Sequence, residues 1–185
     1  MKKFDLFVAV NLLLFLVLCV FRYYASFIEY RGIERHYTFD PVVLNFLQVG
    51  IVMHFCGAFV LIDGGRLYDA SLLGVRYDKY VHFVNAFAAT AVVARLFQIQ
   101  HIPLTRANRL FVLLAVLGLG AAIEIVEYIA VLTVPRNGVG GYDNNMQDLI
   151  VNLCGASAFL MLGATLAASA GARVSADAAG ALRKE

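Results

Sequence analysis

Residues 108–134, NRLFVLLAVLGLGAAIEIVEYIAVLTV, decide the fold class of this chain. A helix rises about 1.5 Å per residue, so about 20 apolar residues are enough to cross the hydrocarbon core of a bilayer. Lipid offers the backbone no hydrogen-bond partner, whereas a helix satisfies its own amide and carbonyl groups. The stretch therefore predicts a transmembrane helix.

Other apolar stretches approach or reach the same length. They cover residues 4–24, 41–62, 79–99 and 146–169. None shows the alternation over about ten residues that is typical of transmembrane β-strands. We therefore predict an all-α fold, a polytopic bundle of about five transmembrane helices that forms one domain over residues 1–169. Residues 170–185 are rich in alanine, glycine and charge, which predicts a mobile tail, and no internal repeat is evident.

The composition also indicates a membrane protein. Of the 185 residues, 61% are hydrophobic and 15% are charged, and the mean hydropathy is +0.76, a balance too apolar for a soluble domain of this size. The formal net charge is only +2 and there is no basic stripe, so we expect no nucleic-acid partner. The cysteines lie in apolar stretches without close spacing, which predicts free thiols. They are Cys19, Cys56 and Cys154.

The first apolar stretch can be compared with a signal peptide. The first stretch follows Lys2 and Lys3 and contains Cys19, as lipoprotein signal peptides do, but Leu18 is bulky where their cleavage site needs a small residue. We therefore expect an uncleaved first helix.

Basic residues predict the orientation of the spans. With five spans, the loops after the first and third spans share one side with the tail, and this side carries more arginine and lysine. The positive-inside rule places that side in the cytoplasm and the amino terminus outside.

Ionisable residues of the spans gather at one depth. A charge in hydrocarbon is costly and marks a functional-site hypothesis. Counting inward from the ends that face the second and fourth loops, these residues lie within roughly 16 Å of one membrane surface. Spacings of three or four residues place members of the same span on one helix face. The pairs are Asp78 with His82, Glu124 with Glu127, and Asp148 with Asn152, and His54 lies at a similar depth.

Glu124 and Glu127 are the strongest candidates for function, because two glutamates one turn apart in hydrocarbon need a proton, a cation or a basic partner. Imidazole and carboxylate groups together suit Zn²⁺, Mn²⁺ or Mg²⁺, which activate water for hydrolysis. We predict catalytic roles for Glu124 and Glu127, one of them as general base, and supporting polar roles for Lys79 and Asn152. The candidate metal ligands are His54, Asp78, His82, Glu127, Asp143 and Asp148.

Structural roles remain open for several of these residues. Asp78 and Asp148 each begin a predicted helix, where a carboxylate caps free amides and offsets the helix dipole. His54 alone would serve as a hydrogen-bond partner between helices. Asp143 lies in a loop rich in glycine and asparagine, which forms either a lid over the site or an ordinary turn.

Three motifs occur in order along the chain. They are YDKYVHF at 77–83, EIVEY at 124–128 and DLIVNLCGA at 148–156. Over about residues 50–165 the chain resembles the uncharacterised bacterial inner-membrane proteins of the YjdF type and, more distantly, the VanZ-like family. The VanZ-like pattern tends to have Glu-x-x-Gln at Glu124 and Glu127, so the YjdF type is nearer. The resemblance implies a multi-pass protein of the bacterial cytoplasmic membrane and names no reaction.

Three functions fit these observations. The first is a metal-dependent hydrolase or modifying enzyme that acts on a lipid-linked or amphiphilic substrate, with membrane lipid as its surroundings. The second is a proton- or cation-coupled carrier, although five spans without an inverted repeat fit known carriers poorly. The third is a non-catalytic membrane scaffold whose polar cluster fixes helix packing.

Overall fold

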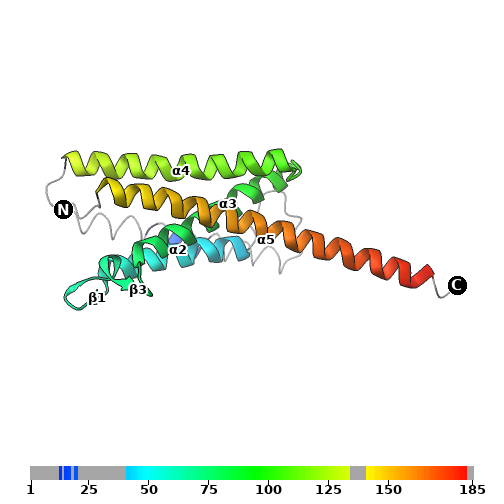
Figure 1. The fold of residues 1–185 in the computed structure, drawn as a ribbon, viewed down its shortest axis with the longest axis horizontal. Coiled ribbons are helices and arrows are strands. Elements are labelled where there is room, and N and C mark those ends of the chain that lie inside the picture. Colours follow the sequence, from blue (N-terminus) through cyan, green and yellow to red (C-terminus); the bar gives the residue numbers. More distant parts are fainter. Residues whose placement is uncertain (1–12, 14, 18, 21–40, 134–140, 183–185) are drawn as a thin grey trace.

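The computed structural model describes residues 13, 15–17, 19–20, 41–133 and 141–182, and its architecture is a bundle of helices. Figure 1 shows α3 running between the other helices and α5 extending past the bundle towards the carboxyl terminus. The helix α3 contacts each of the other three described long helices. These helices are α2 (Pro41–Phe59), α3 (Tyr77–Ile99), α4 (Arg106–Thr133) and α5 (Tyr142–Leu182). The predicted all-α class is confirmed.

Three of the described helices are long and apolar enough to cross a membrane: α3, α4 and the part of α5 from Tyr142 to Gly163. The helix α2 is shorter, with an apolar part from Val43 to Phe59. Of the span predicted at 4–24, only a few helical residues near its centre are described. The helix α5 continues to Leu182 because the alanine-rich sequence after residue 169 favours helix.

Two short β-hairpins occupy the connection between α2 and α3, at one end of the bundle (Figure 1). The central turn residues are Asp63–Gly64 and Leu73–Gly74, all with positive φ, near 52° for the first residue and 80° for the glycine. Positive φ at both positions defines the type I′ turn, which matches the twist of the flanking strands. The strands are β1 (Leu61–Ile62), β2 (Gly65–Arg66), β3 (Ser71–Leu72) and β4 (Val75–Arg76), with the short helix η1 (Leu67–Asp69) between the pairs.

The hairpins repeat each other, which corrects the expectation that the chain has no internal repeat. Leu61 pairs with Arg66 in the first hairpin, and Ser71 pairs with Arg76 in the second, in the same register ten residues later. Both arginines contact Asp69: Arg66 Nε lies 3.0 Å from Oδ2 and Arg76 Nη2 lies 3.5 Å from Oδ1. One carboxylate therefore joins the two units.

Close contact between α3 and α5 depends on Gly155. A Cβ atom at this position would lie 2.3 Å from the backbone oxygen of Phe83, so only glycine fits without movement of the helices. The neighbouring Ala156 is fully buried against Ala86 of α3 and Val116 of α4. Small side chains thus bring α3 and α5 together near the middle of the bundle.

The distribution of polarity is that of a protein in lipid. Large apolar side chains of α4 such as Phe111, Ile125 and Val126 are more than half exposed. The interior holds polar and charged side chains beside a core of mostly small apolar ones, and these polar groups must satisfy one another because lipid cannot. The buried polar residues are Gln48, Asp78, Lys79, Thr90, Glu124, Asp148 and Asn152.

Candidate functional site

Three helices contribute to a polar cluster at the hairpin end of the bundle. The first turns of α3 supply Asp78, Lys79 and His82, the later part of α4 supplies Glu124, and the second turn of α5 supplies Asp148. Figure 1 shows why they meet: α3 and α5 begin, and α4 ends, at the same end of the bundle. We call this set, His82, Glu124 and Asp148 with Asp78 and Lys79, the polar cluster.

Lys79 binds the carboxylate of Asp148. Its ammonium group donates a hydrogen bond of 2.7 Å to Asp148 Oδ1 and one of 2.9 Å to Asn144 Oδ1, and it lies 3.3 Å from Asp78 Oδ2. Asn144 Nδ2 donates a bond of 2.7 Å to the other oxygen of Asp148. Asp148 is 1% exposed and Lys79 is 5% exposed, so solvent does not screen this pair. The orientation of the Asp148 carboxylate is therefore fixed by α3 and by its own helix.

Arg76 links the hairpins to the polar cluster. Its Nη2 atom lies 3.2 Å from Asp78 Oδ2 and 3.5 Å from Asp69 Oδ1. The second hairpin therefore delivers a cation to the first turn of α3, where Asp78 is buried. A buried carboxylate needs such compensation, because isolation in an apolar interior is costly.

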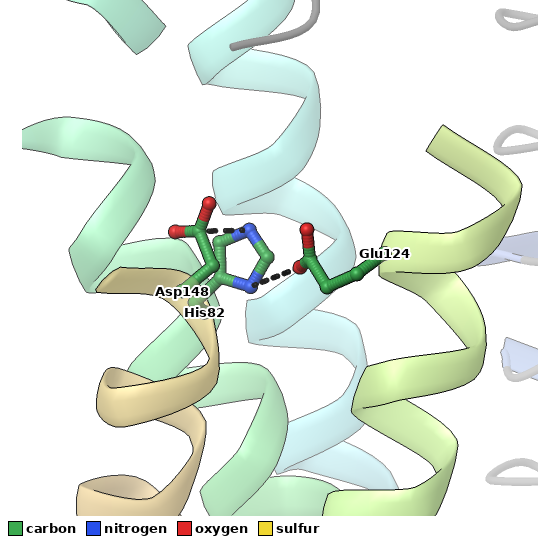
Figure 2. Close-up of side chains that lie close together, drawn as sticks. All are labelled: His82, Glu124 and Asp148. Atoms are coloured by element: carbon green, nitrogen blue, oxygen red, sulfur yellow. Dashed lines mark ion pairs between the residues drawn. The ribbon is translucent and has the colours of Figure 1, made fainter. Parts of the chain in front are cut away.

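The imidazole of His82 lies between two carboxylates (Figure 2). Its Nε2 atom is 3.5 Å from Asp148 Oδ1, and its Nδ1 atom is 3.9 Å from Glu124 Oε1. One ligand atom of each of His82, Glu124 and Asp148 lies within 4.8 Å of the other two. This is the arrangement of side chains that can surround one metal ion.

Glu124 is the least satisfied member of the polar cluster. It is 6% exposed, and neither of its carboxylate oxygens has a hydrogen-bond partner within the described residues. An ionised carboxylate can accept about four hydrogen bonds, and buried polar groups are nearly always partnered. The Glu124 side chain therefore points towards His82 (Figure 2), and no hydrogen bond from a described residue occupies either of its oxygens.

Carboxylate side chains outnumber lysine and arginine side chains in this region. The lysine and arginine side chains are Lys79 and Arg76. Glu127 is half-buried one turn beyond Glu124, and its charge interacts with the charges of His82 and Asp148. With all four carboxylates ionised and His82 neutral, a divalent cation would balance the difference between the carboxylates and these two cations. The carboxylates are Asp78, Glu124, Glu127 and Asp148.

His54 belongs to a second polar contact. Its Nδ1 atom shares a hydrogen bond with the hydroxyl of Tyr68, and the two rings meet edge to face with centroids 5.4 Å apart. Gly57 makes room for this ring, since a Cβ atom there would lie 2.8 Å from Tyr68. Burial and the charge of Glu127 raise the pKa of the Tyr68 hydroxyl, which therefore stays protonated at neutral pH.

The structure brings some of the predicted site residues together and separates others. His82, Glu124 and Asp148 lie close together, and Asp78 and Lys79 adjoin them. Asn152 is buried one turn from Asp148, while Asp143 is exposed in the first turn of α5. Asp148 does not cap a helix, because α5 begins six residues earlier at Tyr142.

Sequence reasoning missed three residues that contact this region: Tyr68, Arg76 and Asn144. Asn144 lies four residues before Asp148 and so shares its helix face, a signal that was available in the sequence. The roles of Tyr68 and Arg76 depend on the hairpins, whose turn at Asp63–Gly64 has the composition that favours type I′.

Residues 1–169 match the model of a protein family described as Predicted membrane protein (DUF2238). No curated protein and no solved structure matches the chain. The family match confirms the predicted relationship to a family of membrane proteins, and its description carries neither the YjdF nor the VanZ name.

Proposed function

Because the chain belongs to the DUF2238 family of predicted membrane proteins, we propose that His82, Glu124 and Asp148 hold a divalent metal ion inside the bundle. The observation that carries the proposal is the buried carboxylate of Glu124, whose two oxygens lack a hydrogen-bond partner in the described part of the chain and face the other two ligands. We further propose that the ion activates water for hydrolysis of a lipid-linked or amphiphilic substrate.

The donor set suits a metal centre that performs chemistry. One imidazole nitrogen and two carboxylate oxygens are the kind of three-ligand set that leaves a position open for water. Two ligand atoms each about 2.1 Å from Zn²⁺ lie at most about 4.2 Å apart. The present spacing of up to 4.8 Å therefore needs only small side-chain movements to close on an ion.

Glu127 is the proposed general base. It lies one helical turn from Glu124, and its charge interacts with that of His82 and Asp148. A base at this place would accept a proton from the attacking water and deliver it to the leaving group, and an ion held by His82, Glu124 and Asp148 would supply Lewis-acid activation. We propose a substrate with an apolar portion because the site lies among helices apolar enough to span a membrane.

Metal analysis tests this proposal. We expect the protein, purified without chelators, to carry stoichiometric Zn²⁺, Mn²⁺ or Mg²⁺ by inductively coupled plasma mass spectrometry, and Glu124→Gln and His82→Gln to lose it. Asp143→Asn and His101→Gln are matched controls, because both residues are exposed outside the polar cluster. Sub-stoichiometric metal in the wild type, or equal metal in the variants, would overturn the proposal.

A second function is supported by the position of His82 itself. Each ring nitrogen faces a different carboxylate, at 3.5 Å from Asp148 and 3.9 Å from Glu124, so small side-chain movements would form the hydrogen bonds of a proton relay. In liposomes, a carrier would show flux driven by a pH gradient, and His82→Gln would abolish it while His101→Gln would not. If the protein folds normally, binds no metal and shows no flux, the remaining function is that of a non-catalytic membrane scaffold.

We also infer from the three ordered motifs that the chain is nearest to the YjdF type. A multi-pass protein of the bacterial cytoplasmic membrane fits these motifs and the three apolar helices.

A further inference from the structure

A cavity of about 540 Å³ lies at the end of the bundle opposite the polar cluster. It is lined by the beginning of α2, the last turns of α3, the beginning of α4, and α5 near Gly163. Arg95 lines it, thirteen residues after His82 on α3, which corresponds to about 20 Å along the helix. The cavity is therefore separate from the proposed metal site.

Two arginine residues line this cavity, Arg95 and Arg109. Neither arginine forms an ion pair with a carboxylate among the described side chains, which end at residue 163. Arg95 Nε is buried and has no hydrogen-bond partner in the part of the chain that the structure describes. Because Arg95 lies within a helix apolar enough to span the membrane, its uncompensated charge calls for an anion.

Both side chains are held in place by neutral groups. Arg95 Nη1 donates a hydrogen bond of 3.1 Å to Gln98 Oε1, and Arg109 Nε donates one of 3.1 Å to the backbone oxygen of Leu104. These bonds orient the guanidinium groups without neutralising them. Planar guanidinium groups bind phosphate oxygens through paired hydrogen bonds, which gives both affinity and geometry.

The remaining walls of the cavity are mainly apolar and include Phe46, Phe159 and Leu160. A free inorganic anion would leave these walls unused, whereas a phospholipid places its phosphate at the membrane surface and its acyl chains beside apolar side chains. Basic pockets between transmembrane helices bind the headgroups of anionic lipids on the cytoplasmic side. The distribution of basic residues predicts the same side for this end of the bundle.

We propose that this cavity binds the headgroup of an anionic phospholipid, with Arg95 and Arg109 on the phosphate and Phe46, Phe159 and Leu160 against the start of an acyl chain. A cavity of this volume is within the range of small-molecule sites. The site acts at the opposite end of the bundle from any chemistry at Glu124, so it does not depend on the proposed function.

Native mass spectrometry of the detergent-purified full chain tests the proposal. We expect wild type to retain phosphatidylglycerol over phosphatidylcholine with the same acyl chains, and Arg95→Gln/Arg109→Gln to weaken this binding by at least about tenfold, because each arginine contributes charged hydrogen bonds. Arg106→Gln is the matched control, since Arg106 is exposed at the start of α4 and does not line the cavity. Like each of the two single substitutions, it removes one positive charge from the same end of the protein.

The outcomes are distinct. Equal retention of both lipids by wild type, or equal retention of phosphatidylglycerol by the double variant, would overturn the proposal. So would inorganic phosphate that displaces the lipid at millimolar concentration, since the apolar walls would then contribute nothing. Arg109→Gln alone keeps the test valid if Arg95→Gln fails to fold, because Arg109 lies in the first turn of α4 and is partly exposed.

Discussion

Lys79 is the cation on which the buried carboxylates of α3 and α5 depend. It is 5% exposed and lies within 3.3 Å of oxygens of both Asp78 and Asp148. Removal of one partner of a buried ion pair leaves an uncompensated charge, which costs about 3–5 kcal/mol. We expect Lys79→Met to lower the free energy of unfolding by this amount, measured by denaturation in mixed micelles.

Two further variants test whether the loss of stability comes from the burial of the Lys79 ion pair and not from the loss of a positive charge alone. The double variant Lys79→Met/Asp148→Leu should be less destabilised than the sum of its single variants, because the two side chains contact each other. Arg66→Met removes a cation from the half-exposed pair with Asp69 and should cost at most about 1 kcal/mol. Strict additivity of the first pair would contradict the role we assign to Lys79.

The close approach of His82, Glu124 and Asp148 could be anticipated from sequence because the rise per residue of a helix is constant. Counting residues inward from the membrane surface gives the polar residues of these three helices a similar depth in the membrane. The count gives depth and not the direction in which a side chain points. His54 therefore entered the same set, although the structure places it against Tyr68, a residue whose position depends on the connection between α2 and α3.

At the scale of elements, the packing of α3 against α5 is set by the absence of a side chain at Gly155. A methyl group there would lie 2.3 Å from the backbone oxygen of Phe83, so Gly155→Ala should push the helices apart. We expect a loss of about 1–3 kcal/mol and a lower midpoint of thermal unfolding in detergent.

The control for this substitution is Gly118→Ala in α4, where an added Cβ atom meets no other heavy atom within 4 Å. Alanine favours helix over glycine by about 1 kcal/mol, so this variant should be as stable as wild type or more so. Equal effects of the two substitutions would mean that helix propensity, and not contact between α3 and α5, determines the result.

Boundaries of elements were harder to predict than their existence. Leu61 and Ile62 continue the apolar character of α2, so the span was predicted to run to residue 62, whereas the chain leaves the helix after Phe59 and enters β1. In the second hairpin the turn begins with Leu73, which is 99% exposed at positive φ, where asparagine or aspartate is the usual signal. The residue types in this turn therefore do not predict the second hairpin.

At the scale of the whole molecule, the hairpins and the loop between α3 and α4 must lie on opposite sides of a membrane if α3 spans it. The positive-inside rule predicts that the hairpin side faces outward. In a background without the native cysteines, we expect Leu73→Cys to react with a membrane-impermeant maleimide in intact cells and His101→Cys to react only after lysis. Both residues are exposed, so access depends on membrane side alone.

The reverse labelling pattern would invert the orientation and place the polar cluster in the cytoplasmic half of the membrane. Labelling of both cysteines in intact cells would contradict the assignment of α3 as a span.

The membrane class itself could be read from composition, because 61% hydrophobic residues leave too little polar surface for a soluble fold. The side that a given loop faces depends on a small difference in basic residues, and this difference is a weak signal.

The tandem hairpins also make the connection between α2 and α3 modular. Each unit is closed by an equivalent backbone hydrogen bond, from Leu67 to Val60 in the first and from Tyr77 to Ala70 in the second, so the chain enters and leaves each unit at nearly the same point. Duplication of one unit would lengthen the chain by ten residues without displacing the start of α3. We therefore expect a short insertion at the exposed turn Asp63–Gly64 to leave the charged side chains at the start of α3 in their positions.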